Sequence, residues 1–181
     1  MHFVLLLAAV VAVVCAARDY VPQRGDFTIS TEVCYRCDND NPSDCVADSI
    51  IIRLTDGVGR TTTMTTWAEP LDTVHWQGFG DVLEEDIDFD GIADLQVCNG
   101  PVNVFGNHTY TAYVWNQSTH SFVLVPNFDE INSFSVDREK RQIGGFWRLD
   151  NEVELSTYEW HDGKLVLVSH ESLDYDTWLE E

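Results

Sequence analysis

A short acidic stretch in the middle of the chain has the residue types and spacing of a calcium-binding loop. Its aspartates stand at alternating positions and can turn their oxygens inward, and Gly91 permits the sharp turn that such a loop needs. Carboxylate and carbonyl oxygens are the ligands that Ca²⁺ prefers. The predicted ligands are Asp86, Asp88, Asp90, the carbonyl of Ile92, and Asp94.

The loop departs from an EF-hand at its twelfth position, where Val97 replaces the bidentate glutamate. Asp94, at the ninth position, would have to substitute for that ligand with help from Glu84 or Glu85. The alternative is a solvated acidic turn without a metal ion, because short motifs also occur by chance.

The first 17 residues have the pattern of a secretory signal peptide. An apolar run extends from Phe3 to Val14, and the small residues before Arg18 suit cleavage there. The run is too short to span a bilayer, and no later segment is apolar enough to do so. We therefore expect a secreted, extracellular protein, periplasmic in a bacterial source, in which residues 18–181 form a single β domain without a membrane span.

The chain is strongly acidic, with a formal net charge of -21 over 181 residues. Such a charge argues against nucleic acid and anionic membranes as partners, and it favours cations, basic proteins or a calcium-rich extracellular surface. Solubility alone is the other explanation. Aromatic and aliphatic residues are plentiful, so the composition does not indicate disorder.

Four cysteines follow the predicted signal peptide: Cys34, Cys37, Cys45 and Cys98. An even number in a secreted chain predicts two disulfides, with three possible connectivities. We favour Cys37 with Cys45, across a turn-rich segment, and Cys34 with Cys98. A redox pair or a zinc site at positions 34 and 37 is disfavoured, since there is no second C-x-x-C and no β-α-β pattern.

Strand-like segments dominate the rest of the chain, with alternating or β-branched residues bounded by turn residues. They cover residues 27–33, 46–54, 61–67, 110–115, 121–125, 158–160 and 164–168. Two similar hairpins contain Trp115 and Trp160, 45 positions apart, which is the spacing of repeated small sheets such as propeller blades. Residues 169–181 suit a short final helix or a frayed tail. The sequence predicts an all-β fold of antiparallel hairpins and small sheets in a compact, propeller-like arrangement.

Two sequons, Asn107-His108-Thr109 and Asn116-Gln117-Ser118, predict N-glycosylation of Asn107 and Asn116 in a eukaryotic source. The tripeptide Arg24-Gly25-Asp26 lies in the expected N-terminal arm of the mature chain. It could contact an integrin-type receptor, or it could be a solvated turn.

No constellation in the chain predicts a catalytic residue. The histidines lack the H-E-x-x-H spacing of a zinc hydrolase, and no G-x-S-x-G or glycine-rich phosphate loop is present. Glu84 with Glu85, or Asp88 with Asp94, could form the carboxylate pair of a glycosidase. However, carboxylates that hold Ca²⁺ stay ionised and cannot act as a general acid.

Four segments occur in an order that is similar to a family of small secreted proteins, mostly bacterial and periplasmic, some of which are lysozyme inhibitors. They are the loop D-x-[DN]-x-D-G-x-x-D-L at Asp86–Leu95, a hairpin at Tyr113–Val123, a Val-Asp-x-x-x-x-x-Ile segment at Val136–Ile143, and a strand pair at Tyr158–Val168. The resemblance implies a compact propeller-like fold. It also implies that the same five predicted residues bind the calcium ion. The cysteine-rich N-terminal third lies outside it.

We therefore predict a secreted, acidic, calcium-binding protein that acts as a non-catalytic binding module, with inhibition of a lysozyme-type glycoside hydrolase as one role. The first alternative is an extracellular-matrix or biomineral glycoprotein, which the acidity and the sequons favour. The second is a carbohydrate-active hydrolase.

Overall fold

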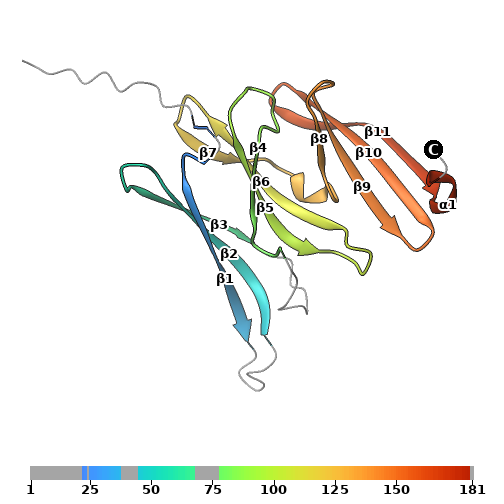
Figure 1. Ribbon diagram of the computed structural model, residues 1–181, viewed down its shortest axis with the longest axis horizontal. Coiled ribbons are helices and arrows are strands. Elements are labelled where there is room, and N and C mark those ends of the chain that lie inside the picture. Colours follow the sequence, from blue (N-terminus) through green and yellow to red (C-terminus); the bar gives the residue numbers. More distant parts are fainter. Residues whose placement is uncertain (1–21, 24, 38–44, 68–77, 180–181) are drawn as a thin grey trace, which may run out of the picture.

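The structure is a computed structural model, and it describes residues 22–179 except for residue 24 and the segments 38–44 and 68–77. The predicted signal peptide lies outside these residues. Figure 1 shows three antiparallel sheets arranged so that the second lies between the other two. Each sheet is made of strands that follow one another in the sequence, which is the arrangement that a repeat of small sheets predicts.

The strands are short and consecutive. The first sheet contains β1 (Thr28–Cys37), β2 (Cys45–Thr55) and β3 (Thr61–Trp67). The second contains β4 (Val82–Glu85), β5 (Asp94–Pro101), β6 (His108–Asn116) and β7 (Ser121–Leu124). A 3-10 turn, η1 (Phe128–Glu130), leads to the third sheet of β8 (Ser135–Asp137), β9 (Gln142–Leu149), β10 (Glu152–His161) and β11 (Lys164–Asp174), and α1 (Tyr175–Trp178) follows.

One core lies between the first and second sheets. Ile50, Ile52 and Leu54 alternate along β2 and are at most 2% exposed, because successive residues of a strand point to opposite faces. They pack against Leu95 and Val97 of β5. Fully burying an aliphatic side chain stabilises a fold by about 1.5–3 kcal/mol, so this alternating set joins the two sheets firmly.

A second core lies on the other face of the second sheet, against the third. Ala112 of β6 contributes to it, as do Ile143 of β9 and Phe128 of η1. Ile87, from the loop between β4 and β5, is also fully buried in this core. The acidic loop is therefore anchored by an apolar side chain next to its aspartates.

The prediction of an all-β antiparallel fold is confirmed, and the repeated hairpins occupy equivalent places. Trp115 pairs with Phe122 in the β6–β7 hairpin, and Trp160 pairs with Leu165 in the β10–β11 hairpin. Each hairpin joins the third and fourth strands of its sheet. The expectation for the C-terminus was only partly right. Residues 169–174 extend β11, because they pair with β10, and the helix that follows has only four residues.

The expected disulfide between Cys34 and Cys98 is wrong, since both thiols are free. Val33 packs against the first core, so the next residue of β1, Cys34, points to the opposite face of its sheet. Val97 likewise faces the first sheet, which turns Cys98 away from it. The two cysteines therefore leave the two sheets in opposite directions.

The other expected disulfide involves side chains that lie outside the described part of the chain. The backbone pairing places Cys37 directly opposite Cys45 at the ends of β1 and β2. Among the described helical segments, none has the length and apolarity that a membrane crossing requires.

Candidate metal site

The acidic loop connects β4 to β5 and turns sharply twice. Phe89 has a φ of 63° and Gly91 a φ of 89°. A glycine adopts this conformation without a steric cost, as the sequence predicted for Gly91, whereas Phe89 adopts it because tertiary contacts hold it there. The loop returns at Asp94, the first residue of β5, which brings the two ends of the loop together.

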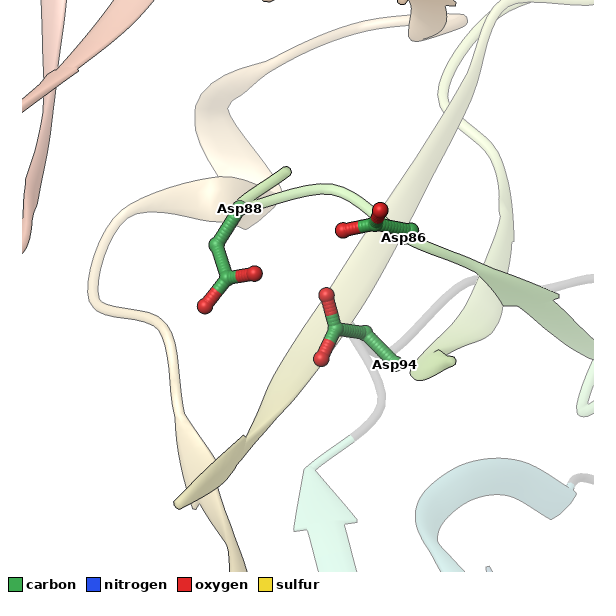
Figure 2. Close-up of side chains that lie close together, drawn as sticks. All are labelled: Asp86, Asp88 and Asp94. Carbon is green, nitrogen blue, oxygen red and sulfur yellow. The ribbon is translucent and has the colours of Figure 1, made fainter. Parts of the chain in front are cut away.

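Three of the five predicted ligands lie together. Asp86, Asp88 and Asp94 each offer a carboxylate oxygen, and these oxygens lie within 4.8 Å of one another. Figure 2 shows the three carboxylates directed toward a common space, with Asp86 and Asp88 coming from one arm of the loop and Asp94 from the other. The sequence pattern of alternating aspartates thus identified this cluster.

Backbone amides fix the carboxylates in this arrangement. Asp94 is 1% exposed. One of its oxygens accepts the N–H of Ile87 at 3.0 Å, and the other accepts the N–H of Trp115 on β6 at 3.0 Å. Asp86 accepts the N–H of Gly91 at 3.0 Å. Asp88 accepts the N–H of Asp90 at 3.2 Å, so a backbone amide holds each of the three carboxylates.

Without a bound cation, the environment of the cluster disfavours the ionised form of its carboxyl groups. Burial, with the neighbouring charges of Asp90 and Asp86, raises the pKa of Asp88 to about 6. Burial also raises the pKa of Asp94 to about 7, although the amides of Trp115 and Ile87 oppose the rise. A bound divalent cation would supply the missing positive charge.

One oxygen of the cluster has no hydrogen-bond partner among the residues that the structure describes. This oxygen, Oδ1 of Asp86, is buried, and a buried carboxylate oxygen without a partner is costly. Hard cations such as Ca²⁺ bind carboxylate oxygens directly. The donor set therefore fits Ca²⁺, with Asp86, Asp88 and Asp94 as the residues that would hold it.

The other predicted ligands behave differently. Asp90 is exposed and does not belong to the group of three carboxylates whose oxygens lie within 4.8 Å of one another. Its oxygens accept the N–H of Ile92 at 2.8 Å and Nε2 of Gln117 at 3.5 Å. The carbonyl of Ile92 stays a predicted ligand. Glu84 and Glu85 do not join the cluster either. Glu84 accepts the N–H of Gly25 at 2.9 Å, and Glu85 forms an ion pair with Arg138.

Contacts from the third sheet hold the loop, and sequence reasoning missed them. The indole N–H of Trp160 donates to the carbonyl of Ile87 at 2.6 Å. Arg141 donates to the carbonyl of Phe89 at 3.1 Å, and its guanidinium lies 5.7 Å from the centre of that ring. Arg141 lies in the basic turn between β8 and β9, and only the fold brings this turn to the acidic loop.

The two sequons have opposite environments. Asn107 is 1% exposed, its amide donates to the carbonyl of Arg148 at 2.7 Å, and its Oδ1 accepts the N–H of Arg148 at 3.2 Å. This environment disfavours the predicted glycosylation of Asn107 in the folded chain, because a glycan attached to the buried amide nitrogen would have no room and would disturb its hydrogen bond to Arg148. Asn116 is partly exposed in the β6–β7 turn, and its glycosylation stays a prediction.

Two residues of the Arg24-Gly25-Asp26 tripeptide are described, and both are exposed. Asp26 accepts the N–H of Gln23 at 2.8 Å, and the N–H of Gly25 donates to Glu84 of β4, which leads into the acidic loop. Arg24 lies outside the described residues, and receptor contact stays a prediction.

Comparisons with known proteins define the class of fold only. No protein-family model matches the chain, and no curated protein matches it. A solved structure described as that of a Xanthomonas Type IV Secretion System related protein is similar, with a TM-score of 0.59 and 17% sequence identity. The match covers 88% of this chain and 84% of that one, so the two proteins are similar in fold over most of their length.

Proposed function

We propose that this is a secreted, calcium-binding β-sheet protein that acts by binding, with the metal ion stabilising a loop rather than taking part in chemistry. The observation that carries the proposal is the cluster of Asp86, Asp88 and Asp94, in which one buried oxygen of Asp86 has no partner within the described part of the chain. The apolar run at the start of the sequence supports secretion.

A metal ion at this position would cross-link parts of the fold that are distant in sequence. Asp94 is hydrogen-bonded to Trp115 of β6, and the neighbouring Ile87 is hydrogen-bonded to Trp160 of β10. A ligand that binds only the folded state raises stability by about 2.7 kcal/mol at a hundredfold excess over its Kd. The expected consequence of calcium binding is thus a more stable junction between the second and third sheets.

The hydrolase alternative has less support. A general acid must reach its substrate, but Asp94 is 1% exposed and backbone amides occupy both of its oxygens. Its raised pKa follows from this burial and does not make it accessible. We therefore propose a non-catalytic role.

For the partner, we propose a strongly basic protein such as a lysozyme. A net charge of -21 would accelerate association with a basic protein by electrostatic steering. The resemblance to secreted lysozyme inhibitors favours this choice over the matrix role. The sequence also lacks the long Asp-rich runs that are typical of mineral-binding chains.

Calorimetric titration with CaCl2, followed by thermal melts with and without calcium, tests the metal site. We expect one bound ion and a rise in melting temperature, both lost in Asp88→Asn. Asp129→Asn removes the same charge from an exposed position of η1 and should retain both. Absence of any calcium effect on the folded wild type at millimolar concentration would refute the metal site.

A separate assay tests the partner. Lysozyme activity on bacterial cell walls, measured with a stoichiometric excess of the protein, should fall, and the effect should weaken as salt screens the charges. No inhibition of several lysozymes would remove that partner while leaving the calcium proposal intact. Recovery of the protein from demineralised tissue would instead favour the matrix role.

A further inference from the structure

An apolar cleft lies between the first sheet and the β6–β7 hairpin, well separated along the chain from the aspartate cluster. Its volume is about 760 Å³. Small-molecule sites in proteins are typically concave, mostly apolar and roughly 300–1,000 Å³ in volume. The cleft therefore has the size of a ligand site.

Aromatic rings form one wall of the cleft and are already packed together. The ring of Phe122 lies 5.1 Å from that of Trp115 and 5.9 Å from that of Phe27, both in edge-on arrangements. Leu54 and Met64 also line the cleft. Because these rings support one another, the cleft is formed before any ligand arrives.

The wall is also held by the backbone. The N–H of Trp115 donates to Asp94 at 3.0 Å, which fixes the part of β6 that carries the indole ring. Trp115 is 7% exposed, and its ring lines the cleft. A ligand would thus meet a rigid aromatic surface, which lowers the entropic cost of binding.

The ion pair at the rim of the cleft adds no net charge to it. Arg60 is bound to Asp56 at 2.8 Å, and Asp56 also accepts the backbone N–H groups of Val58 and Arg60. Arg60 is therefore already compensated and is a poor anchor for an anion. The surrounding molecule, with a net charge of -21, repels anions and attracts cations.

We propose that this cleft binds a small organic cation with an apolar body, such as an aromatic or alkyl ammonium compound. The apolar body fills the space between Leu54, Met64 and the rings, and the positive charge lies against the aromatic faces, which attract cations. This site is distinct from the aspartate cluster and does not rest on calcium binding.

Three matched probes test the ligand class: 2-naphthylmethylammonium, 2-naphthylmethanol and 2-naphthylacetate, each titrated into the purified protein by calorimetry. At low salt the ammonium compound should bind at least about tenfold more tightly than the acetate. Its advantage over the alcohol should persist at 0.3 M NaCl, since contact with the rings is screened much less than long-range attraction. Equal or tighter binding of the acetate, or no binding of the ammonium compound at millimolar concentration, would overturn the proposal.

Two sets of variants locate the site. Gly57 lines the cleft, and a Cβ added there meets nothing within 4 Å, so Gly57→Trp should fill the cleft and weaken ammonium binding at least tenfold. Val104 is 86% exposed and does not line the cleft, so Val104→Trp is the control and should bind normally. Unchanged binding by a folded Gly57→Trp protein would contradict the location.

A charge reversal gives a second measurement that does not depend on filling the cleft. Thr62 is exposed at the cleft, so Thr62→Lys should weaken ammonium binding about threefold and Thr62→Glu should strengthen it by a similar factor at low salt. Circular dichroism and thermal melts establish that both variants are folded. The same affinity in both variants would overturn the proposal.

Discussion

Replacing each sequon asparagine with aspartate provides a direct test of the sheet packing. Asn107 and Asn116 undergo the same chemical change, and each variant adds one negative charge, so the effect of overall charge cancels in the comparison. Asn107 is 1% exposed, whereas Asn116 is partly exposed in a turn. Their expected effects on stability are therefore very different.

At position 107 the substitution removes a donor and buries a charge. The amide nitrogen of Asn107 donates to the carbonyl of Arg148 at 2.7 Å, and an aspartate would direct a carboxylate oxygen against that carbonyl. The carbonyl of Arg148 keeps the amide of Asn103 at 2.8 Å, so the group left without a donor is the new carboxylate oxygen. Losing one hydrogen bond costs about 0.5–1.5 kcal/mol, and burying this unpaired oxygen adds about 1–3 kcal/mol. We expect a loss of about 2–4 kcal/mol in the free energy of unfolding.

At position 116 the substitution retains the contacts that matter. Oδ1 of Asn116 accepts the N–H groups of Ser118 at 2.9 Å and Thr119 at 3.1 Å, and an aspartate can accept both. We expect a change within about 0.5 kcal/mol, as for most surface substitutions. Asn116→Asp is thus the matched control for Asn107→Asp.

Thermal and urea unfolding, followed by circular dichroism, measure both variants. A loss of 2–4 kcal/mol corresponds to a fall in melting temperature of roughly 5–15 °C for a domain of this size. If Asn107→Asp is no less stable than Asn116→Asp, the hydrogen bonding of Asn107 to β9 does not hold the loop after β5. In a glycosylating host, mass spectrometry should find glycan at Asn116 alone.

Three further outcomes follow from single contacts. Asp94→Asn should abolish the calcium-induced rise in melting temperature, because the variant loses one of the three clustered carboxylates; retention of the full rise in a folded variant would remove Asp94 as a ligand. Iodoacetamide at pH 8 should modify Cys34 in the native protein and spare Cys98, because Cys98 is buried and burial raises the pKa of its thiol. Equal labelling of the two cysteines, measured by peptide mass spectrometry, would contradict the packing of β5. Gly145→Ala should lower the melting temperature, since its Cβ would overlap the Ser156 hydroxyl and crowd Ile131 at 3.1 Å, and an unchanged melting temperature would show that these neighbours move aside easily.

The alternation of residue types was sufficient to predict the class of fold. A strand places every second side chain on the same face, so apolar residues such as Ile50, Ile52 and Leu54 identify a buried face without knowledge of what covers it. The same local logic located the acidic loop, since the ligands of such a loop are close in sequence and Gly91 marks its turn. The equivalent hairpins around Trp115 and Trp160 were visible because a repeated sheet leaves a repeated pattern.

Local sequence patterns did not predict the contacts between residues that are distant in the sequence. A disulfide between Cys34 and Cys98 was plausible from the cysteine count, but the direction of each side chain depends on which face of its strand is buried. The sequon at Asn107 is a local pattern, yet its amide is used by Arg148, 41 positions later.

The sequence by itself therefore determined the all-β class, the acidic loop and the three carboxylates that cluster in it, because each of these depends on neighbours within a few residues. Only the tertiary structure decided that Asp90 lies outside the cluster, that Trp160 and Arg141 hold the loop, and that an aromatic cleft forms beside β6. Those features depend on how three sheets pack against one another, and packing brings together side chains whose separation in sequence carries no local signal.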